Sequence, residues 1–84
     1  MADVKFQLSH MTFGEMLRLW RRRKGLSQAA VGALLEPVAH PTTVGCWEAD
    51  SNLPNHKHLS QLLRITGIPP ELALGLPPRE ESQP

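Results

Sequence analysis

Two short stretches of sequence decide the fold: GLSQAAVG at residues 25–32 and PTTVGCWEAD at residues 41–50. Ser27 carries a hydroxyl group that can cap the start of a helix. Pro41 suits the first position of a helix because its fixed backbone angle is already helical. The two stretches therefore predict two short consecutive helices, the second running from Pro41 to Asp50.

The apolar residues of this helix pair indicate how it packs. Gly32 indicates that another helix approaches closely, since a side chain there would hold the two backbones apart. The first helix is expected to end at Glu36-Pro37, because proline cannot continue a helix. The predicted buried face comprises Ala30, Val31, Leu34 and Leu35 from the first helix, with Val44 and Trp47 from the second.

A longer helix is expected before the pair. Thr12 and Glu15 have the types and spacing of a capping box, and Gly25 is suited to end the helix. The cations in its last turn complement the helix dipole. Its apolar stripe consists of Phe13, Met16, Leu17 and Trp20.

Two further helices are expected after the pair. Asn55 can cap the first, and Gly67 can end it. A short last helix is expected to start near Pro69 or Pro70 and to reach Gly75. The apolar stripe between the two caps consists of Leu59, Leu62, Leu63 and Thr66. The predicted fold class is all-α, with five short helices around one core.

The chain is expected to divide into an N-terminal arm at 1–11, a helical domain at 12–76 and a disordered tail at 77–84. Apolar and polar residues alternate in the arm, with apolar Val4, Phe6 and Leu8. One interpretation is an arm that lays its apolar side on the helical core. The other is a short strand, which would need to pair with its copy in a second chain.

Composition excludes several classes of protein. The single cysteine, Cys46, forbids an intrachain disulfide and leaves too few ligands for a structural zinc site. The longest apolar run, at 29–35, is too short to cross a bilayer, and the N-terminus lacks the features of a secretory signal. A cytoplasmic location is therefore expected. The four histidines form no catalytic or metal-binding motif, so we predict no enzyme activity, metal, cofactor or membrane association.

The net charge of +1 conceals a local cluster of positive charge. Five of the nine Lys and Arg residues lie between Arg18 and Lys24, whereas the acidic residues are dispersed. Such a cluster is either a solvated helix end or a surface that faces an anionic partner.

Four segments, taken in order, resemble one family. Residues 25–32 resemble the G-L-S-Q-x-x-L-A run that opens the helix-turn-helix of lambda repressor and Cro-like regulators, and TVGCWE at 43–48 resembles its T-I-S-x-W-E. Pro54 and the leucines that follow resemble P-x-x-x-x-L-x-x-L-A, and IPPEL at 68–72 resembles G-V-S-x-x-x-L. The resemblance covers residues 12–76. It implies a lambda repressor-like DNA-binding domain whose recognition helix lies in the major groove.

The resemblance also implies roles for individual residues. Arg21 matches a family arginine that pairs with the glutamate at Glu48, which would tie the first helix to the recognition helix. Gln28 is expected to meet a phosphate or to support the recognition helix. The expected DNA-contacting residues are Arg22, Arg23, Lys24, Ser27, Gln28, His40, Pro41, Thr42, Thr43, Cys46, Ser51, Asn52, Asn55, His56 and Lys57.

Two features depart from the family pattern. The connection between the paired helices is longer and contains Pro37, so Glu36 to Ala39 is expected to form an extended loop. The recognition helix also lacks the long Gln, Asn and Arg side chains that usually read base edges. Its outward residues are His40, Pro41, Thr42, Thr43, Gly45, Cys46 and Ala49. Specificity is therefore expected to come from DNA shape, bridging water or the neighbouring loop.

The predicted function is sequence-specific binding of double-stranded DNA by a transcriptional regulator, a repressor that acts as a homodimer on a palindromic operator. RNA polymerase is a further candidate partner, which the regulator would block or contact. The candidate dimer residues are Val4, Phe6, Leu8, Ile68, Leu72, Leu74 and Leu76. Two alternatives remain: a protein-interaction module that keeps this fold, and an antitoxin whose main partner is a toxin.

Overall fold

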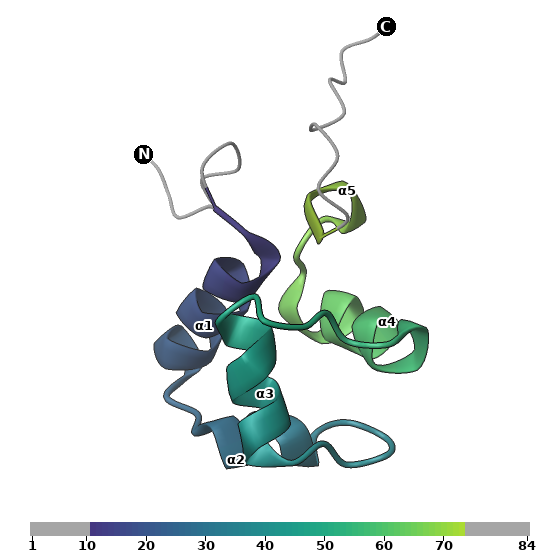
Figure 1. Ribbon diagram of the computed structural model, residues 1–84. Coiled ribbons are helices and arrows are strands. Elements are labelled where there is room, and N and C mark those ends of the chain that lie inside the picture. The colour runs from purple at the N-terminus through teal and green to yellow at the C-terminus, as the bar shows by residue number, and fades with distance from the viewer. Residues whose placement is uncertain (1–10, 74–84) are drawn as a thin grey trace, which may run out of the picture.

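The computed structural model describes residues 11–73, which are helical with no strand among them. Three helices lead the chain: α1 (Phe13–Lys24), α2 (Gln28–Ala33) and α3 (Pro41–Glu48). A fourth, α4 (His56–Thr66), follows, and the single turn α5 (Pro70–Ala73) ends the described part of the chain. Figure 1 shows α3 lying against α1 and α2, with α4 beyond it. The all-α fold class is therefore confirmed.

The predicted helix ends of α1 and α4 are confirmed. Thr12 and Glu15 form a reciprocal capping box at the start of α1. Gly25 ends that helix in the left-handed conformation, with φ 71°, and Gly67 ends α4 in the same way, with φ 79°. Asn55 caps α4 through its side chain, which accepts a hydrogen bond from the backbone N–H of His58. The two glycine ends need no tertiary contact, because glycine reaches positive φ without steric cost.

The core draws on every element from α1 to α4 and on the segment after α4. Trp47 and Val44 supply the inward face of α3, as predicted. Trp20, Leu26, Leu59 and Leu63 pack against the core while remaining partly exposed. The buried apolar side chains are Phe13, Met16, Leu17, Val31, Leu35, Ala39, Val44, Trp47, Leu62 and Ile68.

The first paired helix ends earlier than the predicted end at Glu36-Pro37. Helix α2 ends at Ala33, and Leu34 is its C-cap, with an N–H that points back to Val31 and Gly32 carbonyls. The chain then turns away from the helical path, so Leu35 stays buried while Leu34 is 52% exposed. The prediction that Leu34 lies in the core is wrong because the helical period does not continue past this turn. Helix α3 likewise ends at Glu48 rather than Asp50.

Gly32 makes the close approach that the sequence predicts, although its partner is not a helix. A Cβ atom at Gly32 would lie 2.0 Å from the backbone oxygen of Ala39, just before α3. The Ala39 N–H donates a 3.1 Å hydrogen bond to the Gly32 carbonyl. The absence of a side chain thus lets the chain entering α3 lie directly on α2.

The candidate dimer residues largely fall outside the part of the chain that the structure describes. Val4, Phe6 and Leu8 precede that part, as does the choice between an arm and a strand, and Leu74, Leu76 and the 77–84 tail follow it. The backbone of Leu72 lies in α5. Ile68 is only 1% exposed within its own chain, so its assignment to a dimer surface is corrected: it is a core residue.

Candidate nucleic-acid interface

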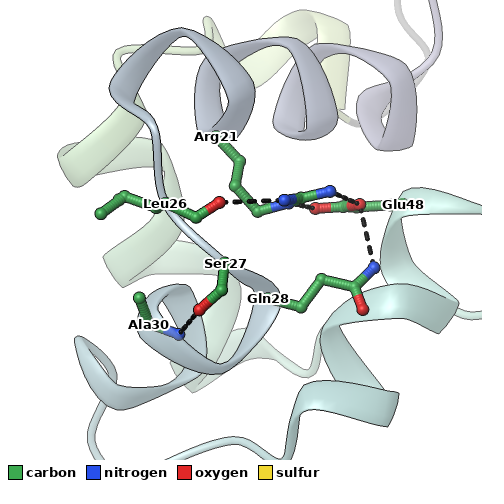
Figure 2. A network of polar contacts seen from close by, with 6 residues as sticks. All are labelled: Arg21, Leu26, Ser27, Gln28, Ala30 and Glu48. Carbon is green, nitrogen blue, oxygen red and sulfur yellow. Dashed lines mark hydrogen bonds and ion pairs between the residues drawn. The ribbon is translucent and has the colours of Figure 1, made fainter.

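Glu48 and Arg21 join the end of α3 to the last turn of α1 (Figure 2). The Arg21 Nε and Nη2 atoms donate to the two carboxylate oxygens at 2.6 and 3.0 Å, a bidentate arrangement. Their side chains are only 14% and 5% exposed. Arg21 Nη1 also donates to the Leu26 carbonyl at 2.9 Å, and the Glu48 hydrogen bond raises the pKa of Arg21 above its ordinary value. The pair predicted from the resemblance is present.

Gln28 joins α2 to the same carboxylate. Its Nε2 atom donates to Glu48 Oε1 at 3.2 Å, as the dashed line in Figure 2 shows. A Cβ atom at Gly45 would lie 3.2 Å from that Nε2, so the missing side chain leaves room for Gln28 across α3. Of the two roles predicted for Gln28, this contact favours support of α3. Ser27 caps α2 by accepting the Ala30 N–H at 2.9 Å.

Asp50 joins the other end of α1 to the residues after α3, a contact that the sequence analysis missed. Its Oδ1 accepts the Gly14 N–H at 3.0 Å, and Thr12 Oγ1 donates to its Oδ2 at 2.6 Å. Asp50 lies at φ 61°, a backbone region that Asp tolerates better than most residues. The residue type signals a turn, but nothing local identifies Gly14, 36 positions away, as the partner.

The outward face of α3 carries short side chains. Thr42 and Thr43 in its first turn are exposed, as is Ala49 directly after its last turn, while Pro41, Gly45 and Cys46 are partly exposed. His40 is the N-cap: its Nδ1 accepts the Thr42 N–H at 3.0 Å, which leaves Nε2 as the donor of the neutral ring. The hydroxyl and methyl groups of the threonines can contact DNA, but they reach less far than Arg or Gln.

Exposed positive and polar side chains precede α2 and follow α3 in the chain. Arg22, Arg23 and Lys24 are exposed at the end of α1, immediately before the turn into α2. A second group, exposed after α3, consists of Ser51, Asn52, Asn55, His56 and Lys57. Within that group, Asn55 uses its side-chain oxygen to cap α4. Positive groups thus lie directly before α2 in the chain, and polar and positive groups lie directly after α3.

The loop 34–40 between α2 and α3 is bound to α4, which the sequence analysis also missed. Gln61 forms a reciprocal pair with the backbone of Glu36, donating to its carbonyl at 2.7 Å and accepting its N–H at 2.9 Å. His58 Nε2 donates to the Pro37 carbonyl at 2.7 Å. The His58 ring also packs against Trp47, with 5.5 Å between ring centroids. Residues 34–37 form a turn and bends rather than regular structure, and α4 holds the loop in place.

Comparisons with family models, with curated proteins and with solved structures found no match for this chain. The family resemblance therefore depends on the four sequence segments. Across residues 11–73, no group of three or more His, Cys, Asp or Glu side chains is arranged to hold a metal ion. No helix in the same range has the length and apolar character needed to cross a membrane.

Proposed function

We propose that this protein is a sequence-specific, double-stranded DNA-binding transcriptional regulator in which α2 and α3 form a helix-turn-helix. Helix α3 lies in the major groove, with α2 above it. The regulator represses transcription as a homodimer on a palindromic operator, since one small module reads few base pairs.

One observation carries this proposal: Glu48, at the end of α3, is bound by Arg21 of α1 and by Gln28 of α2. Gln28 and Glu48 lie within segments that resemble the lambda repressor and Cro-like family, and Arg21 matches a family arginine by position. Their contacts match the role that the resemblance implies. They hold α3 from its buried side, so that Thr42 and Thr43 remain exposed. A helix of eight residues is about 12 Å long, which suits the major groove.

The charge distribution supports contact with phosphates on either side of the groove. Arg22, Arg23 and Lys24 lie before α2 in the chain, and Lys57 lies in the first turn of α4. Because their number is small, the non-specific affinity for DNA is expected to be moderate. The salt dependence of binding then measures how many of these cations meet phosphates.

Selection from random duplex DNA, followed by titrations of the enriched sequence at several salt concentrations, tests the proposal. We expect an enriched motif with two-fold symmetry and a linear fall of log affinity with log salt concentration. Absence of both an enriched motif and a salt dependence would contradict DNA binding.

The double variant Arg22→Ala with Arg23→Ala tests the cationic surface. If both residues meet phosphates in each chain of the dimer, four contacts are lost. The magnitude of the slope of log affinity against log salt should then decrease by about 3.6, with similar losses on specific and random DNA. Arg64→Ala is the matched control, because Arg64 is exposed in the last turn of α4, away from α3 in the chain. An unchanged slope in the double variant would mean that these arginines are a solvated helix end.

A second candidate function is protein binding by the same fold. The short side chains of α3 favour it, as do two large apolar side chains exposed in the adjoining loop, Leu34 and Val38, at 52% and 68%. The selection experiment separates the two functions, because a protein-binding module enriches no DNA sequence.

A further inference from the structure

The loop 34–40 is held at two places, and one side chain projects between them. On one side, Glu36 and Pro37 are hydrogen-bonded to Gln61 and His58 of α4. On the other side, Ala39 is buried on α2, with 5% of its surface exposed. Val38 lies between these anchored residues and is 68% exposed. Val38 is therefore exposed in a loop whose residues on both sides of Val38 are held in place.

The position of Val38 relates it to the proposed recognition helix. Val38 lies two residues before His40, which is the N-cap of α3. The exposed Thr42 and Thr43 follow in the first turn of that helix. In helix-turn-helix proteins the N-terminal residues of the recognition helix contact the base edges. His58, which binds the loop, lies in the first turn of α4 beside Lys57, a proposed phosphate contact. The loop thus lies between two parts of the chain that both face DNA in the proposed complex.

We propose that Val38 is a specificity-determining residue that contacts the C5-methyl group of a thymine in the major groove. This inference rests on the proposed function. The thymine methyl is the apolar feature that the major groove presents, and a β-branched aliphatic side chain with few rotamers meets it at small entropic cost. Through Val38 the protein recognises an apolar group of a base. The adjoining helix α3 lacks the long polar side chains that usually contact base edges. Gln61 is a positioning residue, since its reciprocal pair with Glu36 sets where the loop lies.

The test replaces each thymine of the selected operator, one at a time, with deoxyuridine, which lacks only the methyl group. We expect one thymine per half-site at which the replacement weakens binding of the unaltered protein by about threefold to fivefold, the effect of one buried methyl contact. Val38→Ala alters both half-sites of the dimer, so it should bind the thymine operator more weakly by about the square of that factor, roughly ninefold to 25-fold. It should show no further loss on deoxyuridine at that position.

Two variants make the test specific to Val38. Leu34→Ala removes a second exposed apolar side chain from the same loop, and it should keep the full response to deoxyuridine. Gln61→Met removes both hydrogen bonds to Glu36 while Val38 remains. It should lose the response at that one thymine and keep both its affinity for random DNA and its helical circular dichroism.

The outcomes distinguish this inference from the proposed function. The operator can bind tightly while Val38→Ala shows the same deoxyuridine response as the unaltered protein. That result overturns the Val38 contact and leaves DNA binding intact. The absence of any enriched operator overturns both. A response that disappears in Val38→Ala and persists in Leu34→Ala supports the contact. A response that persists in Gln61→Met overturns the positioning role of Gln61.

Discussion

Glu48 is the residue on which the position of α3 depends most directly. Its carboxylate lies among side chains from α1 and α2, and it is 5% exposed. A buried carboxylate without a partner is costly, whereas the bidentate contact with Arg21 and the Gln28 amide satisfy both oxygens. Glu48 is in turn the counterion of the largely buried Arg21 guanidinium.

Glu48→Ala should therefore lower the free energy of unfolding by about 3 kcal/mol, because it leaves a partly buried cation without its counterion. Glu48→Gln keeps an acceptor oxygen and should cost less, about 1–2 kcal/mol. Urea unfolding followed by tryptophan fluorescence measures both. Glu36→Ala, which removes an exposed carboxylate, is the control and should change stability by less than about 0.5 kcal/mol. Equal stabilities of Glu48→Ala and Glu36→Ala would refute this account.

Asp50 combines two properties that substitutions can separate: a carboxylate that binds Gly14 and Thr12, and a backbone at φ 61°. Asp50→Gly loses the two hydrogen bonds of the carboxylate and should cost about 1–2 kcal/mol. Asp50→Ala also strains the left-handed backbone, which adds about 1–2 kcal/mol. Asp50→Asn keeps an acceptor for the Gly14 N–H and should be the mildest. Thermal unfolding ranks the three, and an alanine variant as stable as the glycine variant would exclude the backbone contribution.

At the scale of elements, two glycines set how closely α2 and α3 approach their neighbours. At Gly32 the obstacle to a side chain is the Ala39 backbone, 2.0 Å from an ideal Cβ. At Gly45 the obstacle is the end of the Gln28 side chain, at 3.2 Å. Backbone atoms in a packed region cannot move aside, but a flexible side chain can.

Gly32→Ala should therefore destabilise the protein by about 2–3 kcal/mol, the usual cost of overpacking. Gly45→Ala should be nearly neutral, because alanine gains about 1 kcal/mol of helix propensity, which offsets the displaced Gln28. The two variants control for each other, since both place alanine in a helix. Chemical denaturation measures the difference, and similar stabilities would show that the approach at Gly32 is not tight.

For the whole molecule, a net charge of +1 matters less than where the charges lie. Arg21 is paired with Glu48, so the exposed cations that precede α2 are Arg22, Arg23 and Lys24. A single module with so few cations gains limited affinity from phosphates. Two modules on one operator would double the contacts, which is why the proposed function includes a homodimer.

The homodimer makes a geometric prediction. Two half-sites about one helical turn apart should bind much more tightly than one, and inserting about five base pairs between them should reduce affinity to nearly that of a single half-site. The insertion rotates the second half-site to the opposite face of DNA. Inserting a full turn instead is the control for length. Sedimentation of the free protein and of its complex measures the stoichiometry; one protein chain on the intact operator would contradict the dimer.

The sequence by itself determined the local features: the capping box at Thr12, the glycine ends of α1 and α4, and the inward faces that include Trp47 and Leu62. Each of these arises from residues within one or two turns of chain, so the spacing of residue types is sufficient to predict it. The Arg21–Glu48 pair was predicted from a family resemblance rather than from spacing.

Only the tertiary structure decided where the loops lie. Asp50 binds the start of α1, and Gln61 binds Glu36, across 36 and 25 positions of sequence. Both contacts involve backbone groups, which every residue carries, so no pattern of side chains marks the partner. The early end of α2 has the same origin, since the chain turns where Ala39 can lie on Gly32. The pattern of side chains along the sequence determines the helices. The partners of backbone groups outside the helices are set only when the helices pack together.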